Sequence, residues 1–329
     1  MNAKTICILL ASTLCSGIAA AAETPGKSPY PAKPVRVIIG TSASGGTDFT
    51  ARIFGQKLSD LWGQSVVMDN RPGATGMIGM GMVAHANPDG YTLSIMNVGH
   101  LIMTAITEKP PFDPGRDLLP VSIIATTPVM LVVHPSVPAR TIQEFIALAK
   151  RQPGKMSYAS GGIAGVQHMS TELLMQEAKI KLLHVPYKGT GPGLIELIAG
   201  QVQLTLTSVP SLMPHVNAGR LRPLAVTGER RVSAAPNVPT FKESGLPGVF
   251  VVIWYGLLAP ARTPSAIVDR IARSVAEVAA MPDVKERMTR SGAEPVGSKP
   301  SEFGPYFRSE RTRWVKIAKQ ANIKPASSR

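Results

Sequence analysis

The chain has 329 residues, of which 44% are hydrophobic and 17% are charged. That balance excludes an intrinsically disordered chain, which combines low hydrophobicity with high charge, and the length allows about two domains. Lys and Arg outnumber Asp and Glu by 35 to 21, a formal net charge of +14. Because the basic residues are scattered and only 5% of residues are aromatic, no nucleic acid is expected as a partner. A diffuse positive field favours small acidic molecules.

The first residues, 1–22, have the order of a secretory signal peptide. Lys4 precedes an apolar run, and four alanines close the run,. The run is shorter than the roughly 18 residues of a membrane span. Both cysteines, Cys7 and Cys15, lie in this segment, so cleavage after it would leave a chain without disulfides. We expect export, with 23–34 as a Pro-rich linker; a buried helix or a lipoprotein anchor are the alternatives.

From residue 35 onward, signals for strands and helices alternate, which predicts an α/β fold. Apolar runs predict strands, and apolar residues three and four apart predict helices. In chain order, strands are expected at 35–39, 66–68, 91–96, 129–133, 156–159, 182–185, 202–206, 224–226 and within 249–261. Helices are expected at 49–61, before 86, at 141–151, 167–177 and 192–199, after Pro264, and at 308–319. Thr47 or Asp48 is expected to cap the first helix.

Two strand–loop–helix units are the best candidates for a binding site. Residues 43–46 read Ala-Ser-Gly-Gly, and residues 159–162 repeat them after another strand and before another helix. Glycine lets the backbone approach a ligand closely, and the first turn of a helix offers unpaired N–H groups with positive partial charge. Such anion sites lie beyond the carboxyl ends of strands in open α/β sheets. The loops therefore predict an anion held between two domains, with tight connectors as the alternative.

Other motifs give no convincing support for an enzyme. Residues 79–84 fit G-x-G-x-x-A but do not directly follow a strand, so close helix packing is the better interpretation. Neither a P-loop nor G-x-S-x-G occurs,. The histidines have no metal-binding spacing, so no metal is expected. His168, just after the second loop, could hold a ligand, the loop or a neighbour. Tyr187 and Lys188 could face a cleft, but we interpret them as structural.

Longer strings of the chain resemble one family, and they follow one another in the family's order. They lie at residues 30–36, 70–74, 87–93, 184–189, 221–227 and 236–240. The chain resembles the Bug receptors, which are extracytoplasmic solute-binding proteins of tripartite tricarboxylate transporters. The resemblance extends over nearly all of the chain after the signal peptide, from residue 30 to about 324.

The resemblance implies an α/β periplasmic binding protein of type II, a Venus flytrap in which each of two lobes is a mixed sheet flanked by helices. The first lobe is expected to be discontinuous, 35–127 plus 228–329, and the second to be 128–227. The implied function is capture of a small carboxylate, without a cofactor and as a monomer, and its delivery to permease subunits of a tripartite transporter. The alternatives are a sensory receptor with a signalling partner and an exported enzyme acting on a carboxylate.

The resemblance also implies that backbone N–H groups of the two glycine loops hold the carboxylate. The expected ligand-binding residues are Ala43, Ser44, Gly45, Gly46, Thr47 and Asp48 in the first loop, Asn97 and Gly99 in a third loop that ends at His100, Ser160, Gly161, Gly162, Ala164, Gly165 and His168 in and after the second loop, and Thr207, next to Ser208.

Three of these positions depart from the family's usual pattern. Ser44 stands where the family usually has Pro, Gly165 lacks the usual hydroxyl, and Thr207 stands where Asp is common. A neutral residue at position 207 disfavours an ammonium group on the ligand. We therefore predict an aromatic or aliphatic acid without an amino group.

Overall fold

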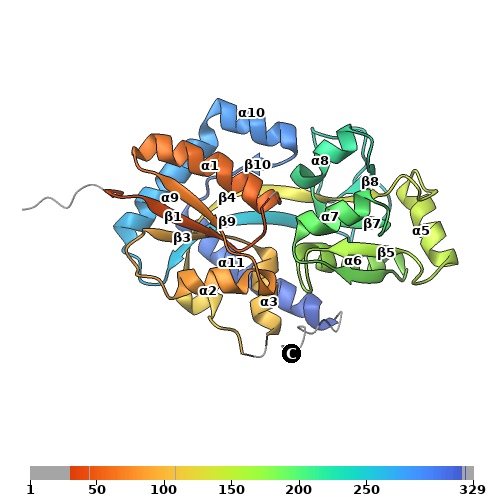
Figure 1. Cartoon of the computed structure of the whole chain (residues 1–329), viewed down its shortest axis with the longest axis horizontal. Helices are drawn as coiled ribbons and strands as arrows, with labels where there is room; N and C mark the ends of the chain where they lie inside the picture. Colours follow the sequence, from red (N-terminus) through yellow and green to blue (C-terminus); the bar gives the residue numbers. More distant parts are fainter. Residues whose placement is uncertain (1–29, 44, 108, 321–322, 324–329) are drawn as a thin grey trace, which may run out of the picture. The chain divides into compact units, whose positions relative to one another are not determined.

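The computed structural model describes residues 30–43, 45–107, 109–320 and 323. The predicted signal peptide, its cleavage site and Ser44 lie outside these residues. From Pro31 on, the described residues belong to one compact unit, in which strands and helices alternate as predicted (Figure 1).

The strands are β1 (Val35–Ile39), β2 (Val66–Asn70), β3 (Thr92–Asn97), β4 (Leu118–Val133), β5 (Ser157–Ser160), β6 (Leu183–Pro186), β7 (Leu204–Ser208), β8 (Arg222–Val226), β9 (Val252–Pro260) and β10 (Glu294–Pro295). The helices are α1 (Gly46–Trp62), α2 (Met77–Ala84), α3 (Val98–Ile106), α4 (Pro114–Asp117), α5 (Ile142–Arg151), α6 (Val166–Ala178), α7 (Thr190–Ile198), α8 (Val209–Asn217), α9 (Ser265–Ala280), α10 (Pro282–Ser291) and α11 (Pro300–Gln320), with a 3₁₀ turn η1 (Ala74–Gly76) before α2.

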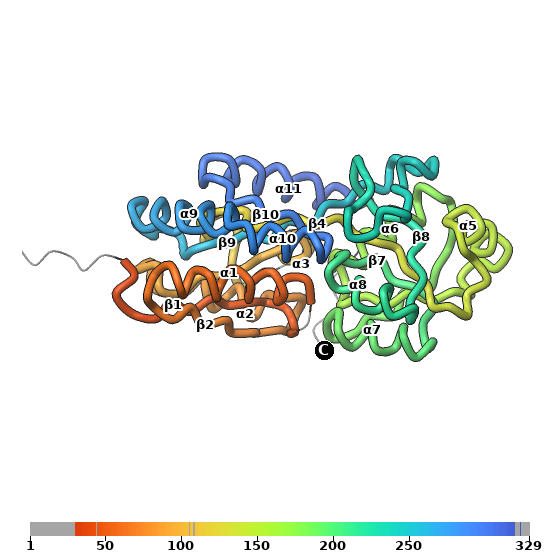
Figure 2. Tube along the Cα trace, turned by 90° about the horizontal axis from the view of Figure 1, so that it is seen from above, coloured from red at the N-terminus to blue at the C-terminus, as the bar shows by residue number. Residues whose placement is uncertain are grey.

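The long strand β4 is shared by two sheets. From Leu118 to Pro128 it pairs antiparallel with β9, and from Val129 to Val133 it lies between β7 and β8. The strand order is β2-β1-β3-β9-β4-β7-β5-β6, with β8 and β10 also paired to β4. We call β1, β2, β3, β9, β10 and the first part of β4 the first sheet, and the last part of β4 with β5, β6, β7 and β8 the second sheet. Figure 2 shows β4 running from one to the other.

Both sheets are mixed, as predicted. In the first sheet β1 is parallel to β2 and β3, whereas β9 is antiparallel to its neighbours β3 and β4. In the second sheet β5 is parallel to β6 and β7, whereas β7 is antiparallel to β4. Parallel neighbours require a crossover, and the helices supply it. The strands β1, β3, β5, β6 and β7 therefore each end immediately before a loop or a helix start.

The start of α1 differs from the prediction. The helix begins at Gly46 with Gly45 as its N-cap and without a side-chain cap, so neither Thr47 nor Asp48 caps it. The Asp48 carboxylate accepts a hydrogen bond from Arg52 Nε at 3.0 Å, one turn further along the helix. The first N–H groups of α1 therefore remain without an intrahelical partner.

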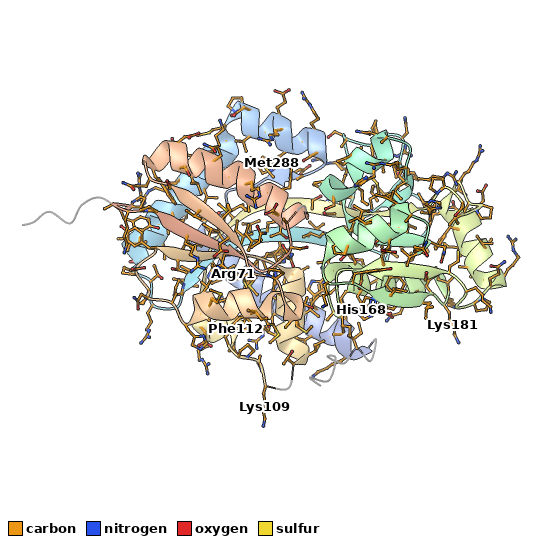
Figure 3. The ribbon with its side chains drawn as sticks, in the orientation of Figure 1. Arg71, Lys109, Phe112, His168, Lys181 and Met288 are labelled. Atoms are coloured by element: carbon orange, nitrogen blue, oxygen red, sulfur yellow. The ribbon has the colours of Figure 1, made fainter. Side chains whose placement is uncertain are left out.

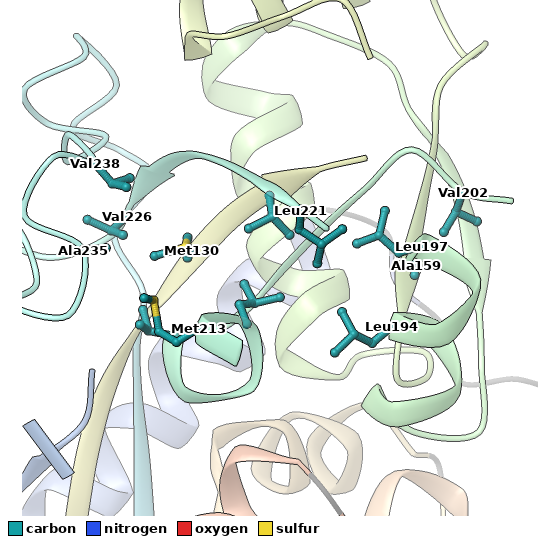
Figure 4. Close-up of a cluster of buried hydrophobic side chains, with 13 residues drawn as sticks. Met130, Ala159, Leu194, Leu197, Val202, Met213, Leu221, Val226, Ala235 and Val238 are labelled. Carbon is teal, nitrogen blue, oxygen red and sulfur yellow. The ribbon is translucent and has the colours of Figure 1, made fainter. Parts of the chain in front are cut away.

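The segment between β8 and β9 packs on the second sheet. Thr240 forms a bridge with Val226 at the end of β8, and Gly248 N–H donates to Glu177 Oε1 of α6 at 3.1 Å. Charged side chains such as Lys181 point outward (Figure 3). The buried cluster of the second sheet includes two residues of this segment (Figure 4); its members are Met130, Val132, Ala159, Leu194, Leu197, Val202, Val209, Leu212, Met213, Leu221, Val226, Ala235 and Val238. Burial of such side chains contributes about 1.5–3 kcal/mol each for Val, Leu and Met.

The helix α11 is fixed to the first sheet by a buried carboxylate. Glu310 is 4% exposed, and its Oε2 accepts hydrogen bonds from Trp254 Nε1 at 3.1 Å and from Trp314 Nε1 at 2.9 Å. Its Oε1 contacts Arg313 Nη1 at 3.3 Å. Trp254 lies on β9, so its hydrogen bond to Glu310 attaches α11 to the first sheet. In the part of the chain that the structure describes, we find no helix long and apolar enough to cross a membrane.

Candidate ligand-binding site

A cavity of about 560 Å³ lies where strands of both sheets end and the next helices begin. This volume falls in the range of roughly 300–1,000 Å³ that is usual for small-molecule sites. Its walls are residues 40–42, 45–47, 72–76, 97, 99, 100, 161, 162, 165–167, 187–190, 207, 208, 253 and 255.

The wall of the cavity suits an anion. The helices α1, α3, α6 and α7 all begin at it or next to it, and each helix start carries a partial positive charge and free N–H groups. Among the described residues of the wall, Lys188 is the one with a formally charged side chain, and none is Asp or Glu. An anion in this cavity therefore meets positive dipoles without a competing carboxylate.

The wall contributed by the first sheet is a neutral, tightly bonded network. Asn97 Nδ2 donates to Thr47 Oγ1 at 3.0 Å, and its Oδ1 accepts from Gly99 N–H at 2.9 Å. Asn97 N–H donates to His100 Nδ1 at 2.9 Å, so the proton of this imidazole sits on Nε2, which bonds the carbonyl of Gly40. Complete burial lowers the pKa of His100 to about 4. The ring is therefore neutral at neutral pH and adds no charge to the site.

The second glycine loop pairs several of its N–H groups with its own side chains. Gly161 N–H donates to Gln167 Oε1 at 2.8 Å, and Ala164 N–H donates to His168 Nδ1 at 3.0 Å. These N–H groups are thus occupied within the protein. The N–H groups of the first turn of α6, at Val166 and Gln167, have no preceding turn to pair with, and both residues line the cavity.

A stack of three rings lies behind this loop. His184 stacks on His168, with ring centroids 4.0 Å apart, and on Tyr158 at 4.8 Å. Its Nε2 lies 2.5 Å from Ser160 Oγ, which accepts from Gly162 N–H at 3.2 Å. Burial, and then the neighbouring His168, lowers the pKa of His184 to about 4. His168 on α6 (Figure 3) therefore supports the loop from behind.

Most of the predicted site residues come together in the cavity wall. Those in the wall are Gly45, Gly46, Thr47, Asn97, Gly99, Gly161, Gly162, Gly165 and Thr207. Asp48, Ser160, Ala164 and His168 are buried and do not line the cavity. Ala43 is exposed and does not line it either, and Ser44 is outside the described residues.

Several wall residues were not predicted as part of the site. Tyr187 and Lys188, interpreted above as structural, line the cavity together with Gly189. The sequence feature that could have identified them is the polar turn directly after the strand predicted at 182–185. Ile253 and Tyr255 come from β9, almost a hundred residues after the second loop, and their own sequence carries no local sign of a site.

The fold and the site together define the class of the protein: a periplasmic binding protein with mixed α/β sheets. A family model described as the tripartite tricarboxylate transporter family receptor matches residues 50–323. The chain belongs to this family, which confirms the resemblance found in the sequence.

Three known proteins illustrate the similarity. Protein BugT of Bordetella pertussis is 31% identical over 297 residues, 90% of this chain and 91% of that protein. The structure of Rpa4515 of R. palustris with adipate is 34% identical, has a TM-score of 0.87, and is matched over 90% of this chain and 100% of that one. The structure of MatC from Rhodopseudomonas palustris with bound malate is 30% identical, has a TM-score of 0.82, and is matched over 88% and 99%.

Proposed function

We propose that this receptor captures a small carboxylate in the cavity and delivers it to the permease subunits of a tripartite transporter. The observation that supports this best is that several helices begin at a wall whose described residues include no Asp or Glu. The N–H groups best placed for the carboxylate are those of Gly46 and Thr47 in α1 and of Val166 and Gln167 in α6, because their helices leave them unpaired. The N–H groups of Gly161 and Ala164 are excluded from this role by their internal bonds.

The two lobes of this receptor are proposed to be the two sheets with their helices. The first crossing is then at Thr127 and Pro128, where β4 changes partner from β9 to β7. The return crossing is proposed at Val251, because the segment before it packs on the second sheet, and not at 227–228. Thr227 forms hydrogen bonds to both crossing segments. Its Oγ1 accepts from Val129 N–H at 3.0 Å and donates to the carbonyl of Val251.

The ligand is proposed to lack an ammonium group. Thr207 is 4% exposed and faces the cavity, so position 207 offers a hydroxyl and no negative charge. A buried ammonium needs a counter-charge, and helix starts repel it. Adipate and malate, named with two of the related structures, are both carboxylates without an ammonium group.

Thermal-shift measurements on the exported chain test this function. The panel contains adipate, malate and aromatic acids, each beside its amino-acid counterpart, such as aspartate for malate. An acid at 100 times its Kd adds about 2.7 kcal/mol of stability, which raises Tm by about 5 °C for a chain of this size. We expect a shift with one class of acid and none with its amino counterpart. Stabilisation by aspartate but not malate contradicts the ammonium argument, and no shift with any acid contradicts carboxylate capture.

Delivery to a permease needs a test in cells. Deletion of the gene for this chain is expected to abolish uptake of the acid that stabilises the protein, and the restored gene is expected to recover it. Unchanged uptake in the deletion strain contradicts the transport role and favours sensing.

A further inference from the structure

A left-handed turn stands at the edge of the cavity between β2 and α2. Four consecutive residues have positive φ: Gly73 at 127°, Ala74 at 46°, Thr75 at 50° and Gly76 at 86°. Glycine adopts such angles freely, but a β-branched residue such as Thr is a clear outlier there. A conformation of this kind persists only where surrounding contacts hold it, and such strain is concentrated at clamps and switches.

The turn is held partly by a hydrogen bond within it and by a side chain of α3. Gly76 N–H donates to the Gly73 carbonyl at 2.9 Å. The ring of His100 lies directly against Gly76, so closely that even a methyl group on Gly76 would overlap it. These contacts fix the two ends of the turn, and Thr75 lies between them.

The remaining contact of Thr75 crosses to the second sheet. Its Oγ1 donates to the carbonyl of Ile163, 88 residues later, at 3.2 Å. The receiving loop is also left-handed, with φ of 136° at Gly162 and 58° at Ala164. Ala164 is held by its bond to His168 Nδ1. Two turns in rarely occupied conformations therefore meet across the cavity, each supported from behind by a buried histidine.

We propose that Thr75 is a clasp that holds the two sheets together over the cavity. It is a positioning residue, because its hydroxyl bonds the protein on the far side. Breaking the bond favours an arrangement in which the two sheets lie further apart at the cavity. A bound acid then dissociates faster. The expected effect on the dissociation of a bound acid rests on the proposed function, whereas the expected effect on the separation of the two sheets does not. A methyl group on Gly162 would lie 3.2 Å from Thr75 Oγ1, which is a tight contact, and the φ of 136° at Gly162 itself favours glycine,.

The test compares Thr75→Val with Thr75→Ser. Valine keeps the β-branched shape but lacks the hydroxyl, and serine keeps the hydroxyl. Small-angle X-ray scattering of the full exported chain without added acid is expected to give a larger radius of gyration for Thr75→Val than for the wild type and Thr75→Ser. Melting curves verify that both variants fold. Equal radii for all three proteins would overturn the clasp.

Stopped-flow dissociation with adipate and with malate as probes gives the second readout. Loss of one neutral hydrogen bond is expected to raise the dissociation rate of Thr75→Val about fivefold, with little change in the association rate and with Thr75→Ser close to the wild type. A rate that is unchanged in Thr75→Val, or raised equally in Thr75→Ser, contradicts the proposal. If the wild type binds neither probe nor any acid of the thermal-shift panel, the proposed function fails, and scattering alone decides the clasp.

Discussion

Replacing His100 by Gln should remove a large part of the acid sensitivity of this fold. The neutral imidazole accepts a bond from Asn97 N–H at Nδ1 and bonds the carbonyl of Gly40 through Nε2. The side-chain amide of Gln also offers one acceptor and one donor, but it does not titrate. His100→Gln therefore keeps a similar bonding pattern while removing the proton equilibrium.

The magnitude follows from the pKa of His100, which burial lowers from 6.5 to about 4. The folded state then binds fewer protons than the unfolded state between these values, so stability is fully present above pH 6.5 and is lost as the pH falls toward 4. At 1.36 kcal/mol per unit, the loss attributable to His100 is about 3 kcal/mol. His184, whose pKa is also lowered, adds to the loss in the same window and remains in the variant.

Urea unfolding at several pH values from 7.5 to 4.5 measures this term. The wild type is expected to lose more stability than His100→Gln over that interval, by about 2–3 kcal/mol. His85→Gln, at an exposed histidine, controls for the removal of a histidine as such. Parallel stability–pH curves for the wild type and His100→Gln would refute the reasoning, whatever the absolute stability of the variant.

Two further substitutions test the buried carboxylate of Glu310 and the neutral side chain of Thr207. Glu310→Ala leaves the indole N–H groups of Trp254 and Trp314 buried without an acceptor, and should reduce the free energy of unfolding by about 2–5 kcal/mol, whereas Glu310→Gln, which keeps an acceptor oxygen, should cost much less; equal losses in urea titrations would show that the shared acceptor is unimportant. Thr207→Asp places a carboxylate in the cavity wall and should weaken binding of the acid that stabilises the protein at least tenfold, because like charges about 5 Å apart repel by about 3 kcal/mol at an effective dielectric constant of 20. Calorimetry with Thr207→Asn as the neutral control measures this, and equal affinity of the two variants would contradict an anion bound near position 207.

Local patterns in the sequence predicted most of the short strands, including partly exposed ones such as β6. The strand at 35–39 was predicted with its observed bounds, because four of its five residues are apolar and buried, with Arg36 as the one exception. The first part of β4 was missed because Pro120 and Ser122 interrupt its pattern, and the structure has irregular pairing at these residues. A bulge shifts the alternation of side chains, so a period of two residues is not visible there.

The candidate site was only partly predictable for a related reason. Glycines and helix starts mark the two loops in the sequence. Which N–H groups stay free depends on side chains such as Gln167 and His168, whose reach back to the loop follows from its three-dimensional path. The clasp of Thr75 on Ile163 joins residues with no sequence relation at all. The wall residue Tyr255 is placed by pairing of β9 with β3 and β4, which no local pattern encodes.

The position of β9 between β3 and β4 has a consequence for the order of folding. The second sheet is built from one continuous stretch, from Val129 to Val226, so its strands can all pair once that stretch is available. The first sheet stays open along β3 and β4 until β9, ending at Pro260, has arrived. Because closing long loops slows pairing, the middle of the chain, from Val129 to Val226, should be ordered first. The N-terminal strands β1, β2 and β3 then keep an unpaired edge along β3 until β9 pairs with it.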